Sequence, residues 1–186
     1  MKRGYTLVES MIVVAISAMA LIALTNLFFT FNSLYGYERA YVNTAGSAGT
    51  AMNALEALVL PANQVLASRT IFGTTYTTAT TTLVLEIPSI DASGNMVSGA
   101  KDYAVFFAST TKLYRIVSPN ASSVRTAGTT TLSSTLNSLS FTYGNPASFT
   151  LATTVLADIQ TSASFKLQTT QGHISENLFL RNYSAP

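Results

Sequence analysis

One acidic residue, Glu9, stands near the start of an apolar run, MKRGYTLVESMIVVAISAMALIALTNLFFTF. A charged carboxylate near the centre of a bilayer costs about 2.5–3.5 kcal/mol on insertion scales. A buried carboxylate without a partner is unfavourable, whereas a paired one is tolerated. The chemistry that Glu9 predicts is therefore the pairing of its carboxylate with a positive group in apolar surroundings.

The other residues that could do chemistry form no recognisable site. His173 is the only histidine, so no multi-histidine metal site exists within one chain. We expect His173 in the turn between the last two strands. Asp158 and the many serines carry no hydrolase signature such as a nucleophile elbow. Residues 91–95 (DASGN) resemble half of a calcium loop, but an ordinary hairpin turn explains them without an ion. We predict no catalytic residue, no metal and no cofactor, and hence not an enzyme.

The composition of the chain excludes several classes of function. The 186 residues include no cysteine, which rules out disulfides, thiolate metal sites and cysteine nucleophiles. Charged residues make up only 10% of the chain, and the formal net charge is +2. Without the pair Lys2-Arg3, eight basic side chains balance eight acidic ones. A near-neutral chain has no long-range field to collect DNA or RNA, so nucleic acid is not expected as the main partner.

The N-terminal apolar run is long enough to cross a membrane. It covers about residues 5–31, and as a helix the ~20 residues 10–29 span about 30 Å, one bilayer core. The pair Lys2-Arg3 places the N-terminus on the cytoplasmic side by the positive-inside rule. A plain signal anchor explains everything in this segment except Gly4 and Glu9.

Residues 2–9 (KRGYTLVE) resemble the processing motif of type IV prepilins and the related pseudopilins. That family has a short basic leader ending in glycine, then an aromatic residue, and a glutamate five places after the scissile bond. The resemblance implies cleavage between Gly4 and Tyr5 by a prepilin peptidase, followed by N-methylation of Tyr5. The chain departs from the family in two places. Tyr5 stands where Phe is most common, and Asn26 stands where many major pilins carry a helix-breaking proline.

The resemblance also gives Glu9 a role in assembly. After cleavage, the new amino group of Tyr5 would lie one helical turn before Glu9, within reach of an i, i+4 contact. The helix N-terminus also favours nearby negative charge. In the family, this glutamate pairs with the amino terminus of the neighbouring subunit. Our hypothesis is that Glu9 selects correctly docked subunits and does not stabilise the monomer.

The helical pattern continues past the membrane segment and stops at Pro61. One helix of about 80 Å is predicted over 5–60. Gly36, Gly46 and Gly49 weaken a helix by up to about 1 kcal/mol each, and are expected to allow close approach by the sheet or by a neighbouring helix. One face of the outer half carries apolar residues at steps of three and four: Phe31, Leu34, Tyr41, Val42, Ala45, Ala48, Met52, Leu55 and Val59.

After Pro61 the apolar period changes to two, which predicts short antiparallel strands. Residues 88–95 are expected as a turn-rich loop and 109–111 as a hairpin turn. Residues 153–160 are ambiguous between strand and loop, and the Thr-rich run 74–82 favours extended backbone and a possible edge strand. The predicted strands are 82–87, 103–107, 113–117, 139–143, 164–168 and 178–182.

These elements predict an α+β fold, in which the second half of a long N-terminal helix packs against a C-terminal antiparallel sheet. This is the layout of the pilin family. We expect a leader at 1–4, a transmembrane and filament-core helix at 5–31, its amphipathic continuation at 32–60 and a β-rich extracytoplasmic domain at 61–186. Strand alternation places Phe106 and Phe107 on opposite faces. One of them therefore needs cover from outside the main core, and a neighbouring subunit could supply it.

The function implied by the resemblance is that of a structural subunit of a type IV pilus. Residues 136–182 more weakly resemble minor pilins of the W and J kind, which favours a minor subunit. The alternatives are a pseudopilin of a type II secretion system and a single-pass anchored adhesion or DNA-uptake module. The implied partners are other pilin subunits, the prepilin peptidase and methyltransferase, the inner-membrane assembly platform, and membrane lipid before assembly. The implied location is the cytoplasmic membrane first and the cell-surface pilus later.

Overall fold

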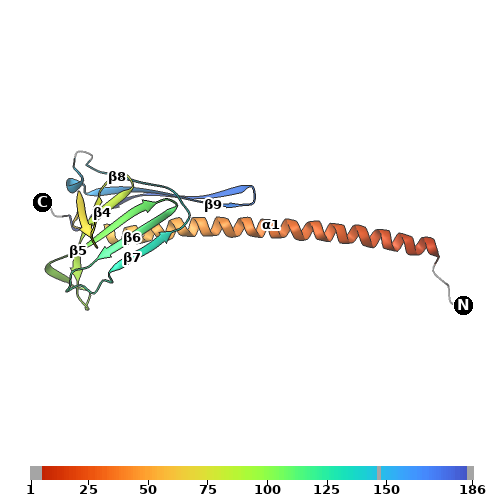
Figure 1. The fold of residues 1–186 in the computed structure, drawn as a ribbon, viewed down its shortest axis with the longest axis horizontal. Coiled ribbons are helices and arrows are strands. Elements are labelled where there is room, and N and C mark those ends of the chain that lie inside the picture. The colour runs from red at the N-terminus through yellow and green to blue at the C-terminus, as the bar shows by residue number, and fades with distance from the viewer. Residues whose placement is uncertain (1–5, 146–147, 184–186) are drawn as a thin grey trace.

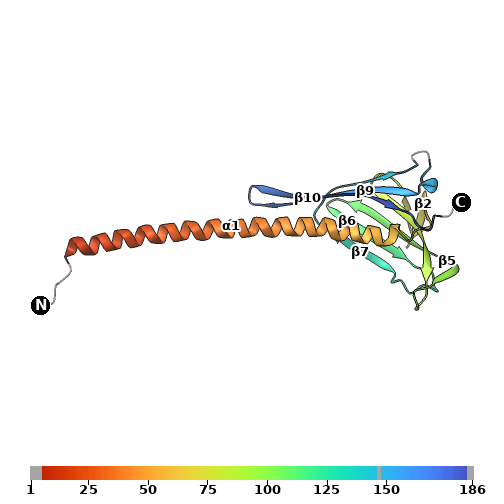
Figure 2. The same cartoon turned by 180° about the vertical axis from the view of Figure 1, so that it is seen from behind.

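A single helix, α1 (Leu7–Val59, 53 residues), runs from near the N-terminus into a β-rich domain at the other end of the molecule (Figures 1 and 2). The computed structural model describes residues 6–145 and 148–183. At 1.5 Å per residue, α1 is about 80 Å long. Thr6 caps its start, because Thr6 Oγ1 accepts a hydrogen bond from the backbone N–H of Glu9 at 3.2 Å. Pro61 follows its last turn, so the predicted helix is confirmed for the described residues.

The two halves of α1 differ in burial. No described residue before Thr44 is buried, whereas one face of the helix from Thr44 onward lies in the core. The predicted apolar stripe is therefore only partly confirmed. Its members from Ala48 onward are buried, but Phe31, Leu34 and Tyr41 are more than half exposed, because only the end of the β9–β10 hairpin reaches this stretch. The buried residues of α1 are Thr44, Ala48, Ala51, Met52, Leu55, Leu58 and Val59.

All strand pairs in the described chain are antiparallel, and they form three sheets. A five-stranded sheet has the order β1-β4-β5-β6-β7, a three-stranded sheet the order β10-β9-β8, and β2 and β3 form a separate hairpin. The strands are β1 (Gln64–Val65), β2 (Ser68–Ile71), β3 (Thr74–Thr77), β4 (Thr82–Ile90), β5 (Met96–Ser109), β6 (Lys112–Ser118), β7 (Gly128–Ser133), β8 (Leu136–Tyr143), β9 (Thr154–Phe165) and β10 (Gln168–Phe179), with a 3-10 turn, η1, at Phe149–Leu151.

The main core lies between α1 and the two larger sheets. α1 contacts β9 and β10 of one sheet and β4 and β7 of the other. Leu55 on the helix, Phe106 on β5 and Ile159 on β9 belong to this core and are fully buried. The long helix packed against antiparallel sheets confirms the predicted α+β fold.

The prediction for Phe106 and Phe107 is confirmed in part. Phe106 points into the main core, and Phe107 packs on the opposite face of the five-stranded sheet. The cover of Phe107 comes from its own chain. The ring centroids of Phe107 and Tyr76 in the β2–β3 hairpin lie 5.3 Å apart, and those of Phe107 and Tyr114 lie 5.2 Å apart. A neighbouring subunit is therefore not needed to cover this ring. The Thr-rich run supplies β3 of this hairpin.

Two predictions near the middle of the chain need correction: the strand predicted at 82–87 is too short, and the loop predicted at 88–95 begins too early. β4 continues through Pro88 to Ile90, because a register shift between these residues accommodates the proline in the strand. The turn that follows is consequently confined to 91–95, where Gly94 has φ +82°. Asp91 Oδ1 accepts hydrogen bonds from the backbone N–H groups of Ser93 and Asn95, which is the geometry of an ordinary turn.

The C-terminal strands differ most from the prediction. Residues 164–168 are not one strand: they include the end of β9, the two-residue turn 166–167 and the first residue of β10, and Lys166 in the turn has φ +54°. The ambiguous residues 153–160 belong mostly to β9. His173 lies within β10, opposite Gln160, and not in a turn. The predicted last strand ends at Phe179, so Arg181 and Asn182 lie outside it. The physical reason is that the long hairpin has Ser and Thr on both faces, so period-two patterning gives no local signal there.

The hairpin of β9 and β10 extends beyond the other strands and runs beside α1 (Figures 1 and 2). Two contacts hold it to the helix near Thr44. Thr161 Oγ1 donates a hydrogen bond to the Thr44 carbonyl at 2.9 Å. Gly172 lies so close that a Cβ at this position would be 3.0 Å from the same carbonyl oxygen. Further toward the N-terminus, a Cβ on Gly36 would overlap the ring of Phe165, whereas Gly46 has no atom within 4 Å of that position. The predicted close approach is confirmed at Gly36.

Candidate assembly segment

The candidate assembly residue Glu9 lies in the first turn of α1. Gly4 and Tyr5, the predicted processing residues, lie outside the described residues. The backbone N–H of Glu9 is used by the Thr6 cap, while its side chain projects from the exposed surface of the helix. No ion pair involves Glu9 within residues 6–145 and 148–183. Its carboxylate can therefore accept a cation from outside this part of the chain, and the helix N-terminus favours negative charge there.

The helix around Glu9 has the length and composition of a membrane span. Its most apolar 18-residue window has a mean hydropathy of 2.4, and none of that window is buried inside the protein. The large apolar side chains of residues 7–31 are all more than half exposed. They are Leu7, Val8, Met11, Ile12, Val13, Val14, Ile16, Met19, Leu21, Ile22, Leu24, Leu27, Phe28, Phe29 and Phe31.

Polar side chains in this segment bond to their own helix. Thr25 Oγ1 donates to the Leu21 carbonyl at 2.8 Å, and Thr30 Oγ1 donates to the Asn26 carbonyl at 2.9 Å. Such internal bonds are what an apolar environment requires of a hydroxyl. The helix also continues without a break through Asn26, as expected where no proline removes a backbone donor. The segment is thus a continuous apolar rod with one carboxylate near its start.

The structure brings His173 and Asp158 together, although sequence spacing does not predict this. His173 Nε2 lies 2.8 Å from Asp158 Oδ2 across the β9–β10 pair. Both side chains are partly open to solvent, and no described serine hydrogen-bonds to the imidazole. A hydrolase would need such a serine in line with the base. No cluster of three or more His, Cys, Asp or Glu residues that could hold a metal ion occurs in the described ranges.

A buried ion pair holds the loop after β6 against β4 and β5. Asp102 on β5 has no exposed surface, and its Oδ2 lies 2.6 Å from Arg125 Nη1. Asp102 also accepts hydrogen bonds from Ser89 Oγ, Ser123 Oγ and the backbone N–H of Asn120. Arg125 donates to the Pro88 carbonyl as well. These residues are far apart in the sequence, and no local pattern in the sequence points to them.

The electrostatics of Asp102 favour its charged form. Burial alone raises the pKa of the Asp102 carboxyl, since a charge is poorly solvated there. The hydrogen bonds from Ser123, Ser89 and Asn120, together with Arg125, outweigh burial and lower this pKa below its ordinary value. Because each partner comes from a β-strand or its connecting loop, the cluster serves the architecture of the domain.

An apolar helix of membrane-spanning length, exposed along its first half and joined to a β-rich domain, is the layout expected of a protein that is anchored in a membrane. The family model of the prokaryotic N-terminal methylation motif matches residues 1–25. This match supports a place for the chain in the type IV pilin and pseudopilin family, whose members are structural subunits. A search of curated proteins and a search of solved structures found no match.

The family match is confined to the N-terminal segment of the chain. It covers the segment with Gly4, Tyr5 and Glu9, and supports membrane anchoring followed by assembly with other subunits after processing by a prepilin peptidase. The resemblance of residues 136–182 to minor pilins of the W and J kind stays a prediction. One of its features, a last strand ending in Arg181-Asn182, is wrong, because β10 ends at Phe179.

Proposed function

We propose that this protein is a subunit of a type IV pilus that assembles through its hydrophobic N-terminal helix after cleavage between Gly4 and Tyr5. The observation that carries the proposal is the single carboxylate of Glu9 in the first turn of a 53-residue helix in which no described residue before Thr44 is buried. An acid in such surroundings requires an external cation. The amino group freed by cleavage is a suitable cation, because it would form at the start of the same helix.

The mechanism begins with insertion of the helix and removal of the leader, residues 1–4. Methylation of Tyr5 follows. Extraction then moves the apolar surface of residues 5–31 from lipid into contact with the helices of other subunits. The charge of Glu9 is tolerated only where a neighbouring amino terminus meets it, so it fixes the axial register of docking. Residues 32–60 connect this filament core to the domain at 61–186, which faces water outside the cytoplasmic membrane.

A minor rather than a major subunit is the finer proposal. It is supported by Asn26, where the helix continues without the proline that many major pilins carry. A secretion pseudopilin would use the same segment in a short filament that stays in the envelope. Shearing cells and probing the released filaments distinguishes the two, because a pilus subunit is released with surface fibres and a pseudopilin stays with the envelope.

Replacing Glu9 with Val tests the role of the carboxylate. Membrane insertion is expected to persist, since Val is apolar, while incorporation into filaments falls about tenfold or more, as loss of even about 1.4 kcal/mol of pairing energy predicts. Ser10→Val is the matched control. It also replaces a polar residue with Val, but Ser10 bonds only to the Thr6 carbonyl, so its incorporation is expected to stay normal. Undiminished incorporation of Glu9→Val would refute the assembly role of Glu9.

A further inference from the structure

The tip of the β9–β10 hairpin lies beside the exposed first half of α1. The ring of Phe165, the last residue of β9, rests over Gly36, and this contact fixes the tip along the helix. Past the tip, β10 returns toward the domain with Gln168 (Figures 1 and 2). Among the described strands, this hairpin reaches furthest toward the apolar segment.

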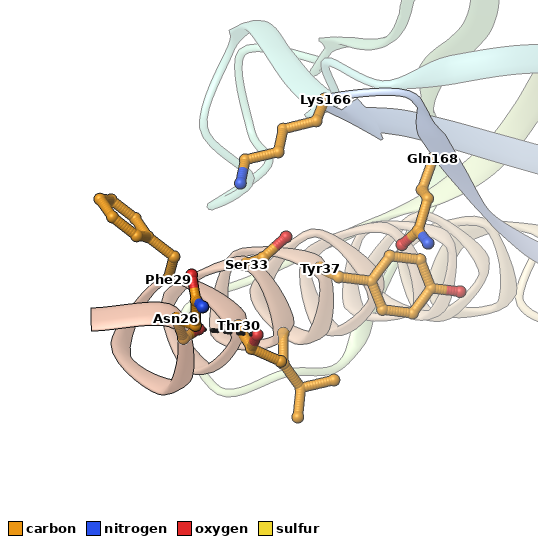
Figure 3. Close-up of a pocket in the computed structure, with 8 residues that line it drawn as sticks. Asn26, Phe29, Thr30, Ser33, Tyr37, Lys166 and Gln168 are labelled. Atoms are coloured by element: carbon orange, nitrogen blue, oxygen red, sulfur yellow. Dashed lines mark hydrogen bonds between the residues drawn. The ribbon is translucent and has the colours of Figure 1, made fainter. Parts of the chain in front are cut away.

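An open groove of about 600 Å³ separates the tip from the helix. Figure 3 shows Lys166 extending from the tip toward Phe29, while Gln168 lies over Tyr37. The ammonium of Lys166 is 5.6 Å from the centroid of the Phe165 ring and has no described carboxylate within ion-pair distance. The groove is lined by Asn26, Phe29, Thr30, Ser33, Leu34, Tyr37, Lys166 and Gln168.

With residues 5–31 in the bilayer, as proposed above, Gly36 beneath the tip would lie at the height of the lipid headgroup layer. The apolar run ends at Phe31, and at 1.5 Å per residue Ser33 and Gly36 lie about 3 and 8 Å further along the helix. The headgroup layer on one side of a bilayer is about 5–8 Å thick. Tyr35 and Tyr37 follow the apolar run at this same level, and tyrosine is enriched at membrane interfaces. The position of the tip is therefore continuous with the membrane span.

The two turn residues have the chemistry of an interfacial anchor. Leu167 is fully exposed, and the neighbouring Lys166 presents a cation. An apolar side chain beside a lysine suits the boundary between acyl chains and phosphates. Lys166 also adopts φ +54°, a conformation for which Gly or Asn would be the usual choice. The turn thus carries Lys166 at a position where turn geometry alone does not favour a lysine.

We propose that the β9–β10 tip binds the headgroup layer of the leaflet on the domain side, with Leu167 inserted at the acyl boundary and Lys166 on a lipid phosphate. The proposal rests on the proposed membrane span of residues 5–31. A second contact with the bilayer holds the domain at one height and orientation before extraction, and it is released when the helix leaves the lipid. The alternative is that the tip contacts a second copy of the chain. Spin–spin broadening distinguishes this contact from contact with lipid.

The test uses the full chain in vesicles of phosphatidylcholine and phosphatidylglycerol. Because the chain has no cysteine, Gln168→Cys places a single nitroxide beside the tip and keeps Lys166 and Leu167. Power saturation with oxygen and a water-soluble nickel chelate then reports its depth. Ser17→Cys in the helix and Ser93→Cys in the exposed β4–β5 turn provide the hydrocarbon and aqueous references.

The expected result is a headgroup-level depth at position 168, at least threefold less accessible to the nickel chelate than position 93. The double change Lys166→Glu with Leu167→Ser is expected to restore the aqueous value. An aqueous value at 168 with a hydrocarbon value at 17 would overturn the proposal and leave the membrane span intact. An aqueous value at 17 would refute the span itself. Spin–spin broadening at 168 that vanishes on dilution with unlabelled protein would assign the tip to a second copy and also overturn the proposal.

Discussion

The two halves of α1 use similar apolar side chains for different partners. From Thr44 onward the helix buries its apolar face against the sheets of its own chain, and Leu55 and Val59 are fully covered. Before Thr44 no described residue is buried, although the apolar residues are larger and more numerous. Apolar surface on this scale is covered by lipid or by other subunits, since a soluble monomer rarely exposes it. The second half thus holds the domain together, and the first half exposes the apolar surface that we propose is used in assembly.

The same contrast between the domain and the first half of α1 holds for two carboxylates, those of Asp102 and Glu9. Asp102 is buried in the domain and is paired with Arg125 and three further hydrogen-bond donors of the same chain. Glu9 is exposed on the helix, and residues 6–145 and 148–183 supply no ion pair for it. The domain therefore satisfies the charge of Asp102 internally, whereas the partner that we propose for Glu9 is an amino terminus outside the described chain.

Truncating matched leucines in the two halves is expected to give the largest difference. Leu55→Ala removes a fully buried side chain and is expected to lower the free energy of unfolding of the domain by about 2–5 kcal/mol. Leu21→Ala removes an exposed one and is expected to change it by less than about 0.5 kcal/mol. Denaturant unfolding in detergent measures both. Equal destabilisation by the two variants would contradict the division of α1.

Replacing Arg125, the partner of the buried Asp102 carboxylate, is expected to give the second-largest loss of stability. Arg125→Ala leaves Asp102 charged and buried, and we expect a loss of about 3 kcal/mol, near the lower end for broken buried pairs because three donors remain. Arg39→Ala, on the exposed part of α1, is the control and is expected to be neutral within about 0.5 kcal/mol. A near-neutral Arg125→Ala would mean that the pair does not hold the loop after β6.

The same cluster predicts a dependence of stability on pH. The pKa of Asp102 is lower in the folded than in the unfolded state, so its contribution is complete above the ordinary carboxyl pKa, near 4. That contribution is lost as the pH falls through the lower folded-state pKa. Unfolding free energies measured from pH 7 down to pH 2 are expected to fall less steeply in Asp102→Asn than in the parent chain. Parallel curves would show that Asp102 does not contribute.

The smallest change in stability is expected from alanine substitutions at two glycines of α1, Gly36 and Gly46. Gly46→Ala is expected to stabilise the protein by up to about 1 kcal/mol, because alanine favours the helix and this side of the residue is open. Gly36→Ala is expected to lose this gain, because the new methyl group overlaps the Phe165 ring. Adding Phe165→Ala to Gly36→Ala removes the overlap and is expected to restore it. Thermal unfolding of the three variants measures the difference. Identical gains at both glycines would show that the tip does not rest on Gly36.

Local signals in the sequence predict the helix and much of the five-stranded sheet. The apolar run and Pro61 indicate the extent of α1, and alternation marks the central parts of β4, β5 and β6. The β9–β10 hairpin is not predictable in this way, because its turn at Lys166 lacks a glycine, proline or asparagine signal. The Asp102–Arg125 pair is non-local, so only the folded chain brings it together. Of the candidate site, the motif at residues 2–9 is readable because its spacing is fixed along one segment.

We propose that the first half of α1 becomes competent for assembly when processing after Gly4 frees the amino group of Tyr5. Mass spectrometry of the N-terminal peptide from filaments sheared off the cell surface examines this step. We expect a peptide that begins at Tyr5 and carries one added methyl group. A peptide that still begins at Met1 with the basic leader would contradict it, because the amino group that Glu9 is proposed to meet would never have formed.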